Sequence, residues 1–435
     1  MDALNIAIAG LGTVGAEVAR QLLHRETALG KAAGRPLILS AVSARNATKD
    51  RGFSMAGIAF EANPVDLAAR ADVDVIIELI GGSEGPAKEL VEAALKAGKH
   101  VITANKALIA HHGQKLAESA EEQGLSLKFE AAVAGGIPAL KTLREGLAAN
   151  EIQRICGILN GTCNYILTEM SRTGRDFADV LQEAQAKGYA EADPTFDVDG
   201  IDAAHKLAIL TALAFSEQVD FKAIPTIGIR HIAQIDIQHA AELGYEIKLL
   251  GMAEQGSQPS VQPWLLPADT QLAKVSGALN AVEYDADPVQ NIICVGPGAG
   301  AGPTASAVLA DLMDVCRRPE ATVFGRAAHE LASAGDKPPQ NGYRRFYLRL
   351  KVADKPGVLS EITAVLRDHG LSVASMLQKD SPAAGSAEAQ PVSLVITTHR
   401  AESMKMQAAL GDLAQLPAVF ETPTALPILD TDTLG

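Results

Sequence analysis

A glycine-rich turn near the N-terminus places the strongest constraint on the fold of this chain. It lies between an apolar run and a helical pattern, and it reads Gly10, Leu11, Gly12, Thr13, Val14 and Gly15. In a strand–turn–helix unit, Gly10 permits the tight turn, Gly12 lets the main chain approach a pyrophosphate, and Gly15 lets the helix pack on the strand. The turn predicts a dinucleotide site at the helix N-terminus. A purely structural glycine turn is the alternative.

Apolar runs alternate with helical periodicity over the first third of the chain. Strands are predicted at 4–10, 36–44, 73–80, 100–104 and 125–133, and helices at 13–29, 86–97 and 106–123. Strands separated by helices at this spacing favour a parallel, doubly wound sheet. We therefore expect an α/β chain with a Rossmann-like domain over 1–134, completed by a returning helix at about 300–320.

Two further domains are predicted after the first. Residues 135–300 mix strand-like pieces with long helices at 176–187 and 201–215, which indicates an α+β domain for substrate binding and dimerisation. The segment 317–344 has weak periodicity and is interpreted as a linker.

The last segment, 345–424, is predicted to be a small separate domain. Its expected elements are strand 346–352, helix 359–369, strand 371–378, a polar loop at 381–390, strand 392–398, helix 401–414 and strand 417–421. This βαββαβ order is typical of a ferredoxin-like fold. The residues from about Thr424 onward are expected to be loosely held.

Charge and composition exclude several classes of partner. A formal net charge of −14 and an aromatic content of 4% disfavour binding to nucleic acid. No apolar run reaches membrane-spanning length, and the N-terminus lacks the features of a signal peptide. The four cysteines form no CxxC pair, which favours a reduced chain. We expect a cytoplasmic protein with no membrane partner.

Basic residues follow the second predicted strand. An NAD-preferring fold usually carries an acidic residue there, but this chain reads Ser43-Ala44-Arg45, with Lys49 and Arg51 nearby. Because a guanidinium suits a 2′-phosphate, Arg45 favours NADP, with NAD still possible. An ordinary solvated basic loop is the alternative.

A dense set of charges precedes an apolar helix at 188–206. The stretch GYAEADPTFDVDGIDAAHK contains Glu191, Asp202 and Lys206, and the last two lie four residues apart on one helix face. Buried charges are costly unless they are paired or meet a ligand. The stretch is therefore a candidate for chemistry, and a surface ion pair between Asp202 and Lys206 is the alternative.

Several motifs together resemble homoserine dehydrogenase followed by an ACT domain. They are GLGTVG, ITANKA at 102–107, FEAAVAGGIP at 129–138, GILNGTCNYIL at 157–167, the 188–206 stretch and DKPGVL at 354–359. The resemblance implies NAD(P)-dependent interconversion of L-homoserine and L-aspartate 4-semialdehyde, in threonine, methionine and isoleucine biosynthesis. It also implies a homodimer or homotetramer inhibited by L-threonine through the ACT domain. A non-catalytic sensor of NADP and amino acids on the same folds is the alternative.

The resemblance also assigns roles to individual residues. Lys206 is the first candidate to carry the proton, because an ammonium can stabilise a developing alkoxide, and Lys106 is the second. Glu191 and Asp202 are implied to hold the substrate ammonium group. Further implied cofactor contacts are Thr103, Lys106, Gly188, Gly300 and Gly302. A monovalent cation such as Na⁺ is implied at Glu130, Val133, Gly135 and Ile137.

Overall fold

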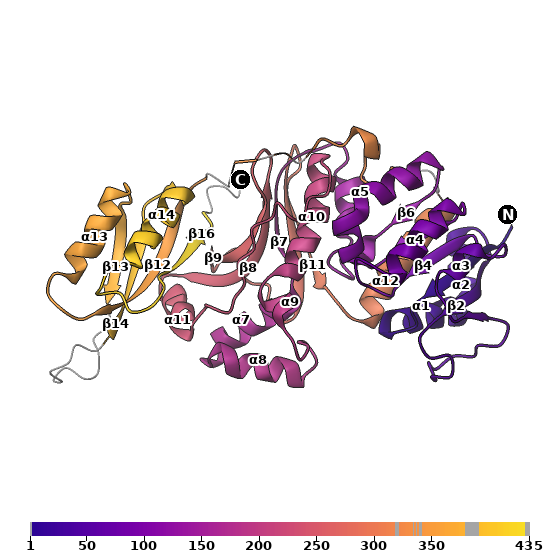
Figure 1. Ribbon diagram of the computed structural model, residues 1–435, viewed down its shortest axis with the longest axis horizontal. Coiled ribbons are helices and arrows are strands. Elements are labelled where there is room, and N and C mark those ends of the chain that lie inside the picture. The colour runs from indigo at the N-terminus through magenta and orange to yellow at the C-terminus, as the bar shows by residue number, and fades with distance from the viewer. Residues whose placement is uncertain are drawn as a thin grey trace.

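The computed structural model forms three units in a row, with the N-terminal unit at the right of Figure 1 and the C-terminal unit at the left. It describes residues 2–317, 322–333, 335, 337–338, 342–378 and 391–430. The polar loop expected at 381–390 and parts of the expected linker at 317–344 lie outside the described residues. No helix in the described part of the chain is long and apolar enough to cross a membrane.

The first unit is built on a parallel sheet that has six strands among the described residues. Its strand order is β3 (Ala59–Glu61), β2 (Leu37–Ser43), β1 (Leu4–Ala9), β4 (Val75–Glu78), β5 (His100–Thr103) and β6 (Leu127–Lys128). The order reverses between β1 and β4, which places ligands at the carboxyl ends of these strands.

Helices cover both faces of this sheet, because buried side chains alternate along each strand. On β1, for example, Ala7 and Ala9 face one core cluster, whereas Ile6 and Ile8 face another. One face carries α3 (Asp66–Ala69), α4 (Pro86–Lys96) and α5 (Lys106–Glu122). The other carries α1 (Thr13–His24), α2 (Glu26–Ala33) and α12 (Ala301–Arg317). Helix α12, orange in Figure 1, thus returns to the indigo unit.

The second sheet runs through the middle unit and on into the C-terminal one. Among the described residues its order is β11 (Gln290–Pro297), β10 (Leu279–Asp287), β7 (Glu151–Ile158), β8 (Tyr245–Glu254), β9 (Ser260–Pro267), β16 (Thr424–Ile428), β12 (Tyr343–Ala353), β14 (Pro391–Thr398) and β13 (Val373–Gln378), with β15 (Ala401–Glu402) on β12.

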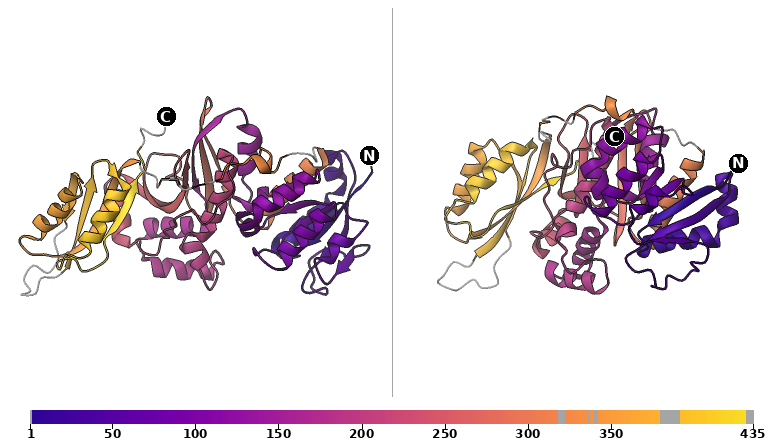
Figure 2. Two further views of the ribbon diagram at one scale, coloured as in Figure 1. Left: turned by 45° about the horizontal axis from the view of Figure 1, so that its top comes forward. Right: turned by 45° about the vertical axis from the view of Figure 1, so that its right-hand side comes forward.

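Most of the other helices lie around this sheet (Figure 2), whereas the two 3₁₀ turns pack on helices of the first unit. They are α6 (Ala139–Lys141), the π-helix η2 (Thr142–Gly146), α7 (Gly161–Thr173), α8 (Phe177–Ala186), α9 (Thr195–Val198), α10 (Ile201–Phe215), α11 (Gln234–Glu242), α13 (Val358–Asp368) and α14 (Ser403–Leu413), with short 3₁₀ turns η1 (Glu130–Ala132) and η3 (Ala328–Glu330). The predicted α/β class, with a parallel N-terminal sheet and a ferredoxin-like C-terminal unit, is confirmed.

The last strand of the C-terminal unit is not where the sequence placed it. The segment 417–421 forms only an isolated bridge between Val352 and Val419, and the fourth strand is β16. Residues Thr424–Ile428 are therefore not loosely held, because β16 pairs antiparallel with β12 and parallel with β9, whereas residues 431–435 lie outside the described residues. Tertiary pairing stabilises this proline-containing strand, whose own sequence is a weak strand former.

Two smaller expectations were also wrong. The expected strand 125–133 shrinks to β6, because the chain turns into η1 at Glu130 and then into a left-handed bend at Ala134 and Gly135. The expected helix 13–29 divides at Arg25, whose φ of −116° ends α1 before α2 begins.

Candidate active site

The glycine turn has the close packing that its sequence predicts. A Cβ atom at Gly10, where φ is +97°, would lie 2.5 Å from the main-chain oxygen of Leu79. A Cβ at Gly15 would lie 1.9 Å from the oxygen of Gly10, so α1 can pack on β1 only through glycine. A Cβ at Gly12 would meet nothing within 4 Å. The open side of the turn is therefore at Gly12, as a pyrophosphate site requires.

A cleft of about 360 Å³ lies over this turn. It is lined by Leu11, Gly12, Thr13, Ala16, Glu17, Arg20, Lys49, Asp50, Arg51 and Ala301. The guanidinium of Arg51 donates to the main-chain oxygens of Leu11 and Lys49, at 3.3 and 2.7 Å. The basic loop after β2 is thus tied to the glycine turn, with Lys49 and Arg51 at the cleft. Arg45 is exposed and is not among the lining residues.

The other glycines implied for the cofactor lie at helix ends. Gly300 has a φ of +119° and its main-chain oxygen accepts from Thr304, which places it immediately before α12. Gly302 lies in the first turn of α12, beside the cleft residue Ala301. Gly188 is exposed, with a φ of +75°, just after α8.

Asp202 is the centre of a buried charge network between the first two units. Its Oδ2 accepts from Lys206 Nζ at 2.7 Å, and its Oδ1 lies 3.1 Å from Lys106 Nζ. Lys206 Nζ also donates to the main-chain oxygen of Leu159 at 2.7 Å. Asp202 and Lys206 are only 5% and 8% exposed, so their contact is not a surface ion pair.

The fold brings these groups together from three elements. Lys106 begins α5 at the carboxyl end of β5, while Asp202 and Lys206 lie one turn apart on α10. Asn160 caps α7 by accepting from Cys163, and its amide donates to Asp202 Oδ2 at 2.9 Å and to Asp197 Oδ1 at 2.8 Å. The site thus depends on the carboxyl ends of β5 and β7.

Electrostatics favour a charged Asp202. Burial would raise the pKa of its carboxyl, but Lys206, Lys106 and the hydrogen bonds hold that pKa well below its ordinary value. The pKa of the half-buried Asp197 moves the other way, raised by burial and by the charge of Asp202 despite the hydrogen bond from Asn160. Asp202 is therefore the anion that two ammonium groups share.

Aromatic side chains border the outer lysine. The side chain of Lys106 is 31% exposed, and its Nζ lies 5.5 Å from the centre of the Phe196 ring. The ring of His205 packs against Phe196 and Phe221, with centroid distances of 5.5 and 4.2 Å. Burial, followed by the charges of nearby residues, lowers the pKa of His205 to about 4. His205 is thus a neutral, structural neighbour of the site.

Two residues singled out in the sequence lie apart from this network. Glu191 is exposed in the loop between α8 and α9, where Gln185 donates to its main-chain oxygen. The hydroxyl of the buried Thr103 donates to Glu78 at 2.5 Å. Glu78 in turn accepts from the main-chain N–H groups of Ile80 and Gly81.

Sequence reasoning missed Asn160 and Glu78. Asn160 follows β7 and precedes α7, so its position as an N-cap was the signal that could have found it. Glu78, a fully buried carboxylate at the end of β4, had the signal of an acidic residue that ends an apolar run.

The loop implied to hold a cation fits that role only through its main chain. The Glu130 carboxylate accepts from the N–H groups of Leu140 and Lys141 at 3.0 and 2.9 Å, so it is occupied by protein donors. Left-handed residues Ala134 and Gly135 bend the loop and reorient its carbonyls. In the described part of the chain, no cluster of three or more His, Cys, Asp or Glu could hold a metal ion.

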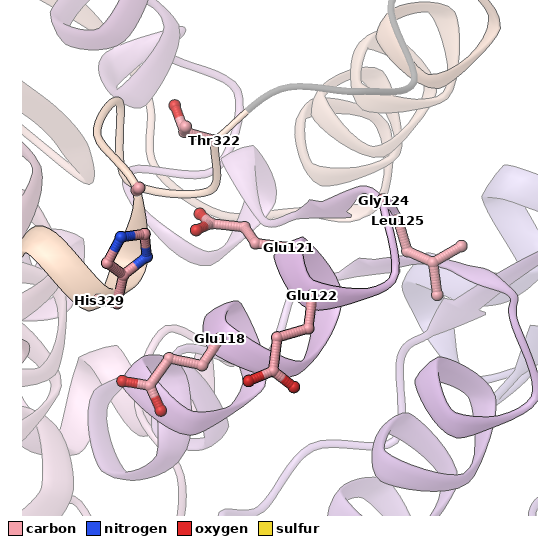
Figure 3. Close-up of a pocket in the computed structure, with 8 residues that line it drawn as sticks. Glu118, Glu121, Glu122, Gly124, Leu125, Thr322 and His329 are labelled. Carbon is pink, nitrogen blue, oxygen red and sulfur yellow. The ribbon is translucent and has the colours of Figure 1, made fainter.

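A cavity of about 460 Å³ lies elsewhere, at the C-terminal end of α5. Figure 3 shows that Glu118, Glu121 and Glu122 approach it from α5, and His329 from the opposite side. The Glu121 carboxylate accepts from Val323 and Ala328 and so fixes the chain after α12. Lys106 stands at the other end of this 17-residue helix, roughly 25 Å away, so the cavity is separate from the Asp202 network.

Comparisons with known proteins give one consistent result. The family model described as homoserine dehydrogenase, NAD binding domain, matches residues 10–130, the homoserine dehydrogenase model matches 138–313, and the ACT domain model matches 346–418. A homoserine dehydrogenase of Neisseria gonorrhoeae is 43% identical, with 98% of each chain covered.

Solved structures agree with these matches. The crystal structure of a homoserine dehydrogenase from Thiobacillus denitrificans gives a TM-score of 0.90 at 40% identity and covers 98% of both chains. A hyperthermophilic archaeal homoserine dehydrogenase in complex with NADPH gives a TM-score of 0.63 at 28% identity, covering 72% of this chain and 97% of that chain.

Proposed function

Because the chain belongs to the homoserine dehydrogenase family and carries an ACT domain, we propose that it interconverts L-homoserine and L-aspartate 4-semialdehyde with NADP as the hydride carrier. The observation that carries the reaction is the Asp202 network, in which two lysines share one buried carboxylate at the carboxyl end of β5. Ligands of doubly wound sheets bind at this edge.

The glycine turn fits a dinucleotide. The space beside Gly12 and the N-terminus of α1 suit a pyrophosphate, and the cleft continues to Ala301. When bound, the nicotinamide supplies or accepts the hydride. Main-chain groups near Thr103, Gly188, Gly300 and Gly302 are proposed to complete the contacts with the cofactor.

The lysines are proposed to manage the proton. An ammonium has three donors, and Lys206 uses two of them on Asp202 and Leu159, so one remains for a substrate oxygen. Lys106 and Lys206 carry two positive charges against the single charge of Asp202. The surplus charge favours a developing alkoxide, and either ammonium can donate the proton.

Asp202 and Glu191 are proposed to have different roles in substrate binding. Asp202 already faces two ammonium groups, so its main effect is to position the lysines. Glu191, exposed in the loop between α8 and α9, is proposed to supply the charge that meets the substrate's ammonium group. Replacing Glu191 by Gln should raise the KM for L-homoserine with little change in kcat. The exposed Asp193, changed to Asn, is the matched control.

The reaction and its proton carrier can be tested together. With L-homoserine and NADP⁺, we expect the absorbance of reduced nicotinamide to appear with time. Lys206→Ala should abolish turnover but retain NADP⁺ binding, and Lys88→Ala on the surface of α4 should change neither. Turnover that survives in Lys206→Ala but not in Lys106→Ala would indicate that Lys106, and not Lys206, carries the proton. A folded wild-type protein that binds NADP⁺ but does not turn over would favour a sensor.

Preference for NADP is proposed from the basic loop after β2. Lys49 and Arg51 line the cleft, and Arg45 follows the strand directly. A 2′-phosphate needs such cations. We expect a higher kcat/KM for NADP⁺ than for NAD⁺, and Lys49→Gln or Arg45→Gln should narrow that ratio. If the ratio of kcat/KM for NADP⁺ to that for NAD⁺ is unchanged in both variants, this loop does not determine cofactor preference.

A monovalent cation is proposed on the loop that follows Glu130. Since the Glu130 carboxylate is occupied, Na⁺ would be held by main-chain oxygens of Glu130, Val133, Gly135 and Ile137. Titration with NaCl against choline chloride should raise the thermal midpoint if the loop binds the ion. Equal midpoints in both salts would contradict the site.

L-threonine is proposed as an effector of the ACT domain. The turn Asp354–Leu359 leads into α13, whose first N–H groups can hold a carboxylate. We expect threonine to lower the rate at fixed substrate. A rate and melting temperature that do not respond to threonine would refute this role.

Assembly into a homodimer or homotetramer is proposed from the two exposed edges of the long sheet. Val295 on β11 is 49% exposed and Met376 on β13 is 42% exposed, and unprotected strand edges favour pairing. Light scattering should give a mass of two or four chains, and a monomer would refute the proposal.

A further inference from the structure

A basic cavity lies at the opposite end of α12 from the dinucleotide cleft. Its volume is about 410 Å³, and it forms where β6, η2 and the last turn of α12 meet. Its described lining residues are Lys128, Arg144, Glu145, Asp314, Arg317, Thr322 and Gly325. Because α12 has 17 residues, roughly 25 Å separate the cavity from Ala301 at the cleft. Residues 318–321 lie outside the described residues.

Lys128 is the unusual feature of this cavity. It is only 3% exposed, yet among the described residues its ammonium has no hydrogen-bond acceptor. Burial lowers the pKa of this ammonium and the neighbouring guanidinium of Arg144 lowers it further, against the smaller opposing effects of Asp311, Asp314 and Glu145. The Arg144 side chain is itself 7% exposed. Two desolvated cations that repel each other are costly unless an anion lies between them.

The nearby carboxylates only partly offset these cations. Asp314 is paired with Lys141, and Asp311 accepts from the main-chain N–H of Glu130 through one oxygen, while its other oxygen lies 3.9 Å from Lys141 Nζ and has no hydrogen-bond partner among the described residues. Glu145 is 55% exposed and contacts Arg144 at 3.3 Å. The C-terminal end of α12 offers only about half an elementary charge. Among the described lining residues there are thus three cations and two carboxylates, a net charge of one positive unit.

We propose that this cavity binds an oxyanion, the phosphate or carboxylate group of a small molecule, through Lys128 and Arg144. Guanidinium and ammonium donors match both groups, and the guanidinium can bind two oxygens at once. Arg317 at the rim provides a third cation that attracts the ligand. The proposal does not depend on the reaction proposed for the Asp202 network.

Thermal unfolding of the full chain in inorganic phosphate, in succinate and in chloride at equal ionic strength tests the site. Saturating NADP⁺ in every sample keeps phosphate away from the glycine turn. At about five times Kd, we expect phosphate or succinate to raise Tm by roughly 2 °C above chloride. The more effective anion identifies the ligand as a phosphate or a carboxylate compound.

Variants locate the effect. Lys128→Met should abolish the anion-dependent rise, whereas Lys88→Met on α4 should keep it. If Lys128→Met does not fold, Arg144→Gln serves in its place and should also abolish the rise. Equal Tm values in the three salts, or a full rise in a folded Lys128→Met or Arg144→Gln protein, would overturn the proposal.

Discussion

Replacing Asp202 by Asn should test whether one carboxylate holds the two lysines in place. The substitution keeps the shape of the side chain and an acceptor oxygen but removes the charge. Asp202 and Lys206 are 5% and 8% exposed, so little water replaces that charge. Removing one partner of a buried pair costs about 3–5 kcal/mol. Because Lys106 remains 31% exposed and can regain water, we expect the lower value, about 3 kcal/mol.

A double-mutant cycle separates this charge effect from packing. Lys206→Met should lower the free energy of unfolding by a similar amount, since it leaves Asp202 buried with fewer partners. The double variant should cost less than the sum of the two by about 1–3 kcal/mol, because it leaves no buried charge unpaired. Urea unfolding at pH 7, followed by circular dichroism, measures the four proteins. Costs that add within about 0.5 kcal/mol would refute the coupling.

The pH dependence provides an independent check on the same carboxylate. Its pKa is lowered in the folded protein, so the stability that it contributes is present above its unfolded pKa, about 4. That stability is lost as the pH falls through the folded pKa. The difference between wild type and Asp202→Asn should therefore shrink below about pH 4. A difference that is constant from neutral to acidic pH would contradict a charge effect.

Three further predictions follow from contacts elsewhere in the chain. Gly15→Ala should lower Tm, since its Cβ would lie 1.9 Å from a main-chain oxygen. Gly12→Ala should leave Tm unchanged but weaken NADP⁺ binding at least about tenfold. Equal effects of the two substitutions on Tm would contradict this reasoning. The pKa of His205 is lowered to about 4 in the folded protein, so the unfolded state binds a proton first as the pH falls from 6.5 to 4, and the protein should lose up to about 3 kcal/mol of stability over that range. His205→Leu should reduce this dependence of the unfolding free energy on pH, as measured by urea titration. Asp236→Asn should cost about 3 kcal/mol of stability, because the buried Arg349 would keep only the more distant carboxylate of Glu421, at 3.8 Å, as a charged partner. Adding Arg349→Met should recover part of that loss, and a larger loss in the double variant would argue against the pair.

The sequence predicted the first unit well because its local and tertiary signals agree. Apolar runs bounded by turns became β1, β2, β4 and β5, and the glycine turn at 10–15 lies where the motif requires. The failures occurred where tertiary contacts override local preference. The strand β16 exists because β9 and β12 pair with it on either side, and its own sequence carries two features of a loop, short length and a proline as its fourth of five residues.

The candidate site was predictable in its residues but not in its connections. The pair of Asp202 and Lys206 followed from their spacing on one helix, and that pair is buried as the apolar helix indicated. The sequence could not show that Lys106 shares the same carboxylate, because the two residues are 96 positions apart in the chain and meet only through the packing of α5 on α10. Glu191 remains a prediction, since its side chain is exposed in the structure.

The continuous second sheet connects the C-terminal unit to the candidate site through a series of packed contacts. On β12, Arg349 and Tyr347 both donate to the fully buried Asp236, whose other oxygen accepts from Ala233 at the start of α11. Helix α11 packs on α7, and the N-cap residue of α7, Asn160, donates to Asp202. A shift of β12 cannot be absorbed by water at Asp236, because that carboxylate is 0% exposed. Movement of the ACT domain must therefore displace α11 or break a buried ion pair, and the former is less costly.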